Sequence, residues 1–413
     1  MRSLGFGVVA LLAGCGSFLP NGPAEEELLD GPIDGLSPAQ LAVFLAGDEE
    51  FGRLFAPADG LGPLFVAQAC ASCHVGDGKG HPVFNLTRFG RATASGFDPM
   101  RAQGGPQLQH RAIQAYQAER IPSGVTGVAV FTAPAVTGLG LLEAVDDSTI
   151  LAFADEHDAD GDGISGRPQL VDPGDLLLDL ASLELLYEPG AKRHQPIDGK
   201  LLGRFGKKAS AINLLHQTVT AYREDMGLTT EQLPLDPINP AMGSFAGDGV
   251  ADPEIGSSTV ANVVFYLKTL RPPPRRGADD PEVVAGEALF RGIGCASCHR
   301  PTMRTGSSSI AVLDRVELHP YTDLLLHDMG PELDDGYTEG RATTAEWRTP
   351  PLWGLGLAER SQGGRAFYLH DGRATTLEAA IELHGGEGSA SREAFRGLDP
   401  VERARLLAFL RSL

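Results

Sequence analysis

The chain has 413 residues, of which 42% are hydrophobic and 21% charged, so it is a folded chain with room for two or three domains and not a disordered one. Its formal net charge is −20, which disfavours nucleic acids and anionic membrane surfaces as partners. The 52 glycines and 29 prolines predict much irregular chain between helices.

Residues 1–14 predict a signal sequence. Arg2 is followed by an apolar run over residues 4–13, which is too short to span a bilayer comfortably and is typical of a secretory signal. The run ends in Leu-Ala-Gly-Cys, with Cys15 last, which is similar to a bacterial lipobox. That resemblance implies cleavage before Cys15 and attachment of lipid to its sulfur, and the glycine that follows favours the outer membrane. The alternative is an ordinary signal peptide with an incidental cysteine.

Residues 15–44 are predicted to form an acidic, proline- and glycine-rich tether that leads into a helix. Ser37 can cap this helix and Pro38 suits its first position, so we expect the helix to run to about residue 46. No later apolar run is long enough to span a membrane, so we expect membrane contact only through the lipid anchor.

The sequence Cys-Ala-Ser-Cys-His occurs twice, at residues 70–74 and 295–299. Two thiols at this spacing can form thioethers to one haem, and the adjacent imidazole can bind its iron. A zinc site would need the two pairs to converge, and an isolated redox pair of cysteines has no use for the histidine. We therefore expect two covalently bound haems c. The attachment residues are Cys70, Cys73, Cys295 and Cys298, and the proximal iron ligands are His74 and His299.

An internal repeat surrounds the two motifs. Phe65 stands five residues before the first motif and Phe290 five residues before the second. Two further pairs of similar segments follow in the same order, namely 132–141 with 349–357, and 262–270 with 405–413. The repeat predicts two copies of one domain.

Three consecutive prolines at 272–274 cannot continue a helix and mark the boundary between the copies. Strand signal is poor, so we predict a mainly α fold of two tandem cytochrome c-like domains, the first with a long insertion. The predicted domains are 45–271, with the insertion at about 141–257, and 277–413.

An aspartate-rich loop lies within the insertion. Asp158, Asp160 and Asp162, followed by Gly163, reproduce the first half of an EF-hand calcium loop. The twelfth position is Gln169 instead of glutamate, so the second half does not match. The loop predicts a calcium site, with a merely solvated loop as the alternative.

Residues 60–413 resemble the bacterial dihaem cytochrome c peroxidases. The strongest matches are Arg-Thr-Pro-Pro-Leu at 348–352 and the segment 368–380, which contains His-Asp-Gly. More narrowly, the chain resembles the dihaem oxidoreductases called thiol oxidoreductase-like. The phrases that carry this narrower resemblance are 138–144, 158–167, 202–206 and 384–387.

The distal ligand of the second haem is predicted to be His384. A helix over 376–384 ends at two glycines and places His384 on its apolar face. In the peroxidases that the chain resembles, the position fourteen after the histidine of His-Asp-Gly carries the distal ligand, commonly methionine, and here that position after His370 is His384. An imidazole in place of a thioether lowers the haem potential. The rival ligands are Met329 and His327.

The first domain has no counterpart of His384, so its distal position stays open among several residues. They are His81, His110, Gln107, Gln109, His216 and Met226. Gln107 and Gln109 are predicted to hydrogen-bond a bound peroxide. Glu143, in a phrase that resembles the family, is predicted to move a proton between the peroxide oxygens. An inter-haem tryptophan would have to come from the second domain, with Trp353 as the candidate.

We therefore expect an exported, periplasm-facing lipoprotein, anchored at the outer membrane, that reduces hydrogen peroxide at the first haem. Electrons would enter from a donor cytochrome or similar redox protein through the second haem. Two alternatives remain: a non-enzymatic electron-transfer cytochrome, if both haems have six protein ligands, and a high-valent haem oxidase of a protein or small molecule.

Overall fold

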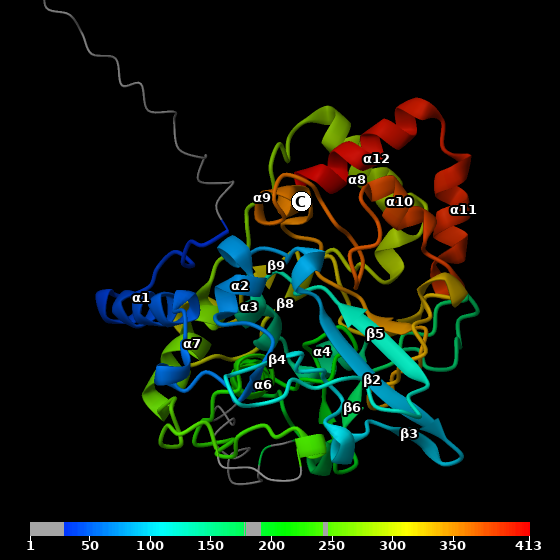
Figure 1. Ribbon diagram of the computed structural model, residues 1–413. Helices are drawn as coiled ribbons and strands as arrows, with labels where there is room; N and C mark the ends of the chain where they lie inside the picture. Colours follow the sequence, from blue (N-terminus) through cyan, green and yellow to red (C-terminus); the bar gives the residue numbers. More distant parts are fainter. Residues whose placement is uncertain (1–28, 177, 179–190, 243–246) are drawn as a thin grey trace, which may run out of the picture.

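The computed structural model describes residues 29–176, 178, 191–242 and 247–413 (Figure 1). The predicted signal sequence and Cys15 lie outside these residues. No helix of the described residues combines the length and the apolar character needed to cross a bilayer.

Helices are the longest elements of the fold. They are α1 (Pro38–Gly52), α2 (Cys70–Cys73), α3 (Leu139–Glu143), α4 (Asp147–Leu151), α6 (Leu214–Met226), α7 (Ser257–Thr269), α8 (Pro281–Gly292), α9 (Ala358–Ser361), α10 (Leu377–Glu382), α11 (Ser389–Gly397) and α12 (Pro400–Ser412). As predicted, Ser37 caps α1, with Pro38 at its first turn.

The prediction of a mainly α fold missed several small antiparallel sheets. The strands are β1 (Leu64–Phe65), β2 (Leu86–Thr93), β3 (Gly96–Asp98), β4 (Arg111–Ala112), β5 (Gly127–Phe131), β6 (Leu170–Val171), β7 (Leu201–Leu202), β8 (Met303–Arg304), β9 (Glu317–Leu318), β10 (Leu326–Asp328) and β11 (Glu346–Arg348). One sheet has three strands, in the order β3-β2-β5, and the others pair β1 with β4, β6 with β7, β8 with β9 and β10 with β11. Most of these strands have two or three residues, too short to show a period in sequence.

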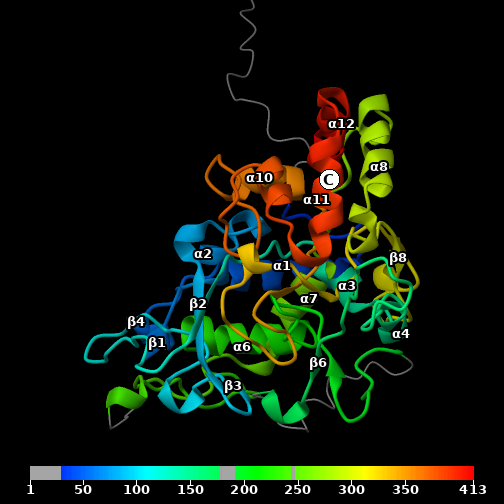
Figure 2. The ribbon, with the colours of Figure 1, turned by 90° about the vertical axis from the view of Figure 1, so that its right-hand side faces the viewer.

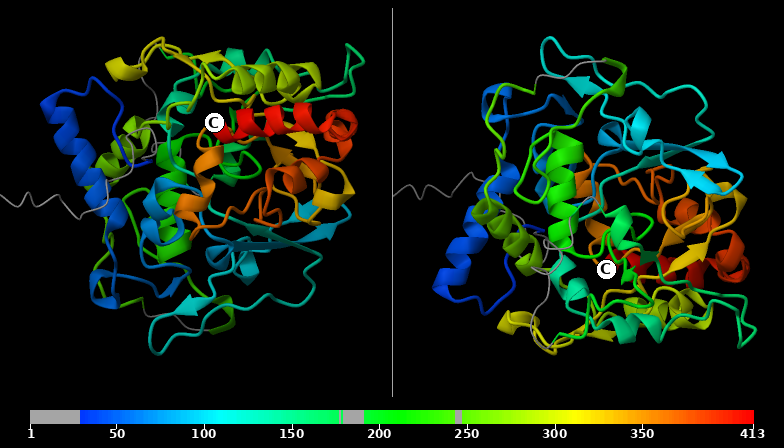
Figure 3. Two further views of the ribbon diagram at one scale, coloured as in Figure 1. Left: turned by 90° about the horizontal axis from the view of Figure 1, so that it is seen from above. Right: turned by 90° about the horizontal axis from the view of Figure 1, so that it is seen from below.

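Two helix pairs make equivalent contacts in the two halves of the chain. Helix α1 packs on α7, and α8 packs on α12, which stand side by side in Figure 2 and in the view from above in Figure 3. A Cβ atom added at Gly47 would lie 2.3 Å from the carbonyl oxygen of Asn262, and one at Gly286 would lie 2.0 Å from that of Arg405. Each pair therefore crosses at a glycine.

A second close approach of a glycine to a backbone carbonyl also occurs in both halves of the chain. A Cβ at Gly140, in α3, would lie 1.9 Å from the carbonyl oxygen of Lys268, and a Cβ at Gly356 would lie 2.0 Å from that of Arg411. Both glycines stand at the same point of the Gly-Leu-Gly-Leu segments. The similar segments found in the sequence thus have the same backbone neighbours in the structure.

One landmark of the sequence repeat was assigned wrongly. Phe290 packs on Phe409 in the second half, and its ring lies 6.3 Å from that of His299. The residue with the same contacts in the first half is Phe51, whose ring lies 5.9 Å from that of His74 and 5.5 Å from that of Tyr266. Phe65 instead lies in β1, and the predicted domain boundary at residue 45 falls inside α1. The cause is that additional residues separate α1 from its motif.

Candidate haem centres

The first motif forms a single helical turn, α2, and His74 follows as its C-terminal cap. The Nδ1 atom of His74 lies 2.7 Å from the carbonyl oxygen of Pro134. Because a carbonyl can only accept, Nδ1 carries the proton and Nε2 keeps its lone pair, which is the form of histidine that binds a metal. Burial lowers the pKa of His74 to about 4, so the ring is neutral at physiological pH.

The second motif repeats this arrangement. Cys295–Ser297 form a short 3-10 helix, and the Nδ1 atom of His299 lies 2.9 Å from the carbonyl oxygen of Tyr321. The pKa of His299 is also lowered to about 4, and burial is the largest cause. Each motif therefore presents one neutral imidazole with a free Nε2.

The four motif cysteines are free thiols. Among the described residues, the one metal-like cluster that includes a thiol contains Cys298 with Asp323 and His327, and it takes no thiol from the first motif. The two pairs do not converge, which argues against the zinc alternative. Burial raises the pKa of Cys70 and Cys295 to about 12, so these thiols are protonated and are not poised as redox nucleophiles.

His384 has the same ligand-ready form as the two motif histidines. It follows α10, whose N-terminus is capped by Thr376, and its Nδ1 lies 2.8 Å from the carbonyl oxygen of Ala380. The charge of His384 is close enough to that of His299 to lower the pKa of His299. The two imidazoles therefore lie within electrostatic range of each other, as two ligands of one haem would.

The rival His327 has no free nitrogen. Its Nδ1 lies 2.6 Å from Glu387 Oε2, and its Nε2 lies 2.8 Å from Asp323 Oδ2. Burial lowers the pKa of His327, but Asp323 and Glu387 outweigh it and raise the pKa well above its usual value. A doubly protonated ring cannot bind iron. Met329, the other rival, packs against a cluster that contains Leu333 and Trp347.

The glutamines predicted to contact peroxide are engaged within the protein. Gln107 Nε2 donates to the backbone oxygen of Glu224 (2.9 Å) and to Asp225 Oδ1 (2.6 Å). Gln109 Nε2 donates to the backbone oxygen of Glu224 (3.0 Å), with longer contacts to two other carbonyls. Both side chains are buried and brace the C-terminal end of α6. These contacts do not favour the predicted role in binding peroxide.

The remaining histidine and methionine candidates of the first half are not arranged as His384 is. His110 is exposed, and Met226 lies in the core around α6. His216 is buried, and its Nδ1 accepts the backbone N–H of Ile212. His81 Nδ1 accepts the backbone N–H of Val83 (3.1 Å), so its Nε2 carries the proton and can donate a hydrogen bond.

Glu143 is buried and fully engaged. Its Oε1 lies 2.8 Å from Lys268 Nζ, and its Oε2 accepts the backbone N–H of Leu214 (2.6 Å) at the start of α6. Burial raises its pKa, but Lys268 and His194 outweigh this and hold the pKa at about 2. A carboxylate that stays ionised is a poor proton donor at neutral pH, so its contacts favour a structural role over the predicted acid/base role.

The family described as "Di-haem oxidoreductase, putative peroxidase" matches residues 124–413, more than half of the chain. The chain belongs to this family. The matched residues include the second motif and begin after the first.

No curated protein matches the chain. Among solved structures, hydrazine synthase of Kuenenia stuttgartiensis is similar over 98% of this chain and 99% of that one. The identity is 13% and the TM-score is 0.40, too low to support any conclusion about this di-haem oxidoreductase.

Haem fits a group of cations between the motifs of this di-haem oxidoreductase. Lys207 is partly buried, and its charge lowers the pKa of His74, so the two lie close together. Burial, with the charges of Lys79 and Arg348, lowers the pKa of Lys207 well below its usual value. Among the described residues, the Lys207 ammonium has no hydrogen bond or ion pair. Such a group suits the propionate carboxylates of haem, which Lys79, Lys207 and Arg348 would hold.

Strand β11 places Arg348 beside the first half of the chain. The Arg348 N–H donates to the carbonyl oxygen of Lys207 (3.0 Å), and its Nε donates to that of Gly206 (2.9 Å). Sequence analysis missed Lys207, although it stands in an unusual Gly-Arg-Phe-Gly-Lys-Lys run. This run of positive charge was the only feature of the sequence that marked Lys207, because the residue that contacts the run, Arg348, comes from the other half of the chain.

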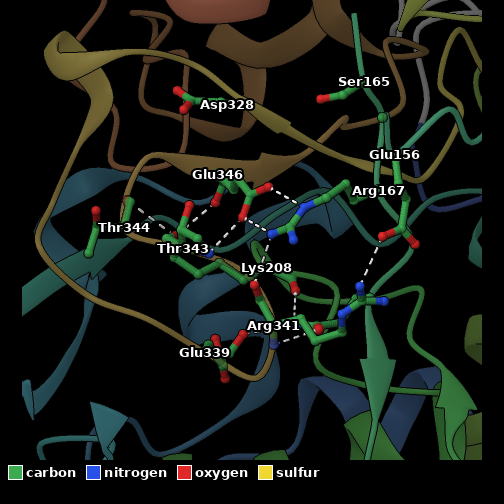
Figure 4. A network of polar contacts seen from close by, with 12 residues as sticks. Glu156, Ser165, Arg167, Lys208, Asp328, Glu339, Arg341, Thr343, Thr344 and Glu346 are labelled. Carbon is green, nitrogen blue, oxygen red and sulfur yellow. Dashed lines mark hydrogen bonds and ion pairs between the residues drawn. The ribbon is translucent and has the colours of Figure 1, made fainter. Parts of the chain in front are cut away.

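A polar network holds β11 in this position (Figure 4). Lys208 Nζ donates to the carbonyl oxygens of Thr343 and Glu346, each at 2.8 Å, and Arg167 Nε donates to Glu346 Oε1 at 2.7 Å. Lys208 also lies 3.9 Å from the centre of the Trp347 ring, which stacks on His370. Trp353 instead packs against Gly138, in the hydrophobic cluster that contains Leu142 and Tyr266. Trp347 is therefore the tryptophan beside Lys208 and His370.

The predicted calcium loop brings together a slightly different set of residues. The carboxylates of Asp158 and Asp160 gather with that of Asp155, within 4.8 Å of one another, while Asp162 is outside this group. Asp162 Oδ1 accepts the backbone N–H of Ile164 instead. Asp160 and Asp162 are exposed. Calcium binding by this loop stays a prediction.

Proposed function

We propose that this di-haem oxidoreductase carries two covalently attached haems c and reduces hydrogen peroxide at the first one. Electrons would come from a redox-protein donor, such as a cytochrome, and enter through the haem of the second motif. Haem supplies the redox-active iron at each site. Peroxide would take up an electron pair and two protons and leave as two waters.

The observation that carries this proposal is the difference between the two motifs. His299 has a second ligand-ready imidazole nearby, His384, and two protein ligands close an iron to substrates. No imidazole with this arrangement is seen near His74 among the described residues. The first site is therefore the one suited to bind a small oxidant.

Protons at the first site would come from Asp225 rather than Glu143. The carboxyl of Asp225 lies near Cys70 and Cys73, since its charge raises the pKa of both thiols. Burial raises the pKa of Asp225 to about 6, although Gln107 donates a hydrogen bond to it. A group with this pKa can release and regain a proton near neutral pH, as general acid catalysis requires.

We also propose that the protein is exported and held at the periplasmic side of the outer membrane by lipid on Cys15. The lipobox-like sequence is the support for this part of the proposal. Mass spectrometry of the mature N-terminus tests it, because lipid on Cys15 predicts a mass increase that a Cys15→Ser variant lacks. An unmodified Cys15 in the mature protein would contradict the anchor.

Electron paramagnetic resonance tests the redox proposal, since it counts high-spin and low-spin iron separately. The oxidised and half-reduced protein is recorded with and without hydrogen peroxide. We expect a high-spin signal in at least one of these states, and its consumption by peroxide. Two low-spin signals that peroxide leaves unchanged in both states would instead make the chain an electron-transfer cytochrome.

A further inference from the structure

A group of carboxylates lies after α6, apart from both motifs and from the aspartate loop at 155–162. Side-chain oxygens of Asp236, Asp252 and Glu254 lie within 4.8 Å of one another. A fourth carboxylate, Asp248, is close enough to raise the pKa of Asp236. We call these four residues the acidic pocket.

The acidic pocket contains buried oxygen atoms with no partner. Asp236 is 8% exposed, and its Oδ1 is buried without a hydrogen bond, as are Asp248 Oδ2 and Glu254 Oε1. Only two other carboxylate oxygens of the described residues are in this state, and one of them, Glu224 Oε2, pairs with Arg88. Unpartnered buried oxygens are costly, so their concentration in one place indicates a missing partner.

No cationic side chain of the described residues pairs with the pocket. Among the residues that the structure describes, none of the four carboxylates forms an ion pair with lysine, arginine or histidine. Burial, together with the charges of Asp252, Asp248 and Glu254, raises the pKa of Asp236 to about 7. Two residues donate hydrogen bonds to the pocket: the N–H and hydroxyl of Thr229 bind Glu254 Oε2, and the Val250 N–H binds Asp248 Oδ1 (2.8 Å). These donors leave Glu254 Oε1 and Asp248 Oδ2 without a partner. The pocket therefore has an excess of negative charge.

The carboxylate oxygens lie close enough together to bind one divalent cation. Calcium binds oxygen ligands at about 2.3–2.6 Å, so oxygens on opposite sides of one ion lie roughly 4.6–5.2 Å apart. Magnesium requires shorter bonds and keeps most of its water. We propose that the acidic pocket binds one calcium ion through Asp236, Asp252 and Glu254, with Asp248 completing the site.

The bound ion would stabilise a loop that packs on residues 60–62, ahead of the first motif in the chain. Glu254 lies against Gly60, where an added Cβ would be 2.2 Å from its Cγ, and residues 230 and 255 form a backbone bridge. Gly62 in turn donates its N–H to the last residue of α6, Met226. Calcium would thus fix the chain that connects α6 and α7 to the segment before Cys70.

The test is calcium titration of the haem-loaded, full-length protein by calorimetry after treatment with a chelator. Asp236→Asn is expected to lose one equivalent of bound calcium. Glu231→Gln removes an exposed carboxylate from the same loop and should keep this equivalent. The double variant Asp158→Asn, Asp160→Asn should keep it as well. Calcium binding by Asp236→Asn equal to that of the unmodified protein would overturn the proposal.

Thermal unfolding separates cation binding from a purely structural role of Asp236. In chelator, Asp236→Asn should unfold at the same temperature as the unmodified protein or above it, because repulsion between the carboxylates is relieved. Calcium chloride should raise the unfolding temperature of the unmodified protein and of Glu231→Gln, but not of Asp236→Asn. A variant that is less stable in chelator, or a calcium response that it retains, would contradict the site.

Discussion

The two motif sites share their proximal side and differ in what surrounds it. In both, the motif histidine donates Nδ1–H to a backbone carbonyl, and a phenylalanine from a neighbouring helix lies beside the ring. The charge of a further imidazole, His384, acts on the pKa of His299, whereas the charge of Lys207 acts on the pKa of His74. The two halves therefore share the environment of the motif histidine and differ in the charged and imidazole groups around it.

A second difference concerns equivalent glutamates. The repeat aligns Glu143 with Glu359, each following its Gly-Leu-Gly-Leu segment. Glu143 is 4% exposed and paired with Lys268, whereas Glu359 is exposed. The first half adds α6 against this position, and α6 needs a carboxylate at its first N–H. The glutamate at this position of the repeat therefore stabilises the fold in the first half only.

The largest expected effect is on the second site. If His384 is the distal ligand proposed, His384→Ala should convert one of the two haems from low-spin to high-spin, with both haems still covalently attached. Absorption and electron paramagnetic resonance spectra measure the change. His319→Ala, an exposed histidine of the same half, is the control. Unchanged spectra of His384→Ala would remove the main difference between the sites.

Glu143→Gln should destabilise the fold, while Glu359→Gln should not. The pKa of Glu143 in the folded chain is about 2, below its ordinary value of 4.5. Its ion pair therefore stabilises the fold fully above about pH 4.5, and the contribution is lost as the pH falls toward 2. The shift corresponds to about 3 kcal/mol at neutral pH.

Denaturant unfolding at several pH values measures this effect. The free energy of unfolding of Glu143→Gln should be lower at pH 7 and should fall less steeply between pH 4.5 and 2. Peroxide turnover, corrected for the folded fraction, should be unaffected. A slower turnover at unchanged stability would restore the catalytic role that the sequence suggested for Glu143.

Substitution of the glycine at each helix crossing should lower the free energy of unfolding by a similar amount in both halves. Gly47→Ala and Gly286→Ala each place a Cβ against a backbone carbonyl, and overpacking of this kind costs about 1–3 kcal/mol. Gly52→Ala in α1 and Gly292→Ala in α8 meet nothing within 4 Å and serve as matched controls. The change in free energy of unfolding is the measurement. A loss of stability from only one of the two substitutions would show that the two helix pairs are not equivalent.

The smallest expected effect is on the potential of the first haem. Paired with a haem propionate, Lys207 would keep its positive charge near His74, and Lys207→Gln would remove that charge, favour the oxidised iron and lower the reduction potential. Charges roughly 10 Å apart at an effective dielectric of ~20 interact by about 1–2 kcal/mol, or roughly 40–90 mV for one electron. Potentiometric titration measures it, with the exposed Lys192→Gln as control. An unchanged potential would contradict the proximity of Lys207 to the first haem.

Local sequence determined the two Cys-Ala-Ser-Cys-His motifs, the capped start of α1 and the segments that recur in the two halves. Each of these depends on residues within a few positions of one another, so spacing alone carries the information. The sequence also singled out His384 as a candidate ligand, because a short apolar helix and the family resemblance placed this histidine at a helix end.

Only the tertiary structure decided which polar side chains are free. His327 and His384 are both histidines near glycines, and what separates them is Asp323 and Glu387 on either side of His327. Glu143 and Gln107 looked like reactive groups until α6 supplied their partners. Residues far apart in sequence contribute these partners, and burial makes each pairing decisive, since an unpaired polar group away from water is costly. The sequence shows the groups, whereas their protonation and availability arise from the packing of distant segments.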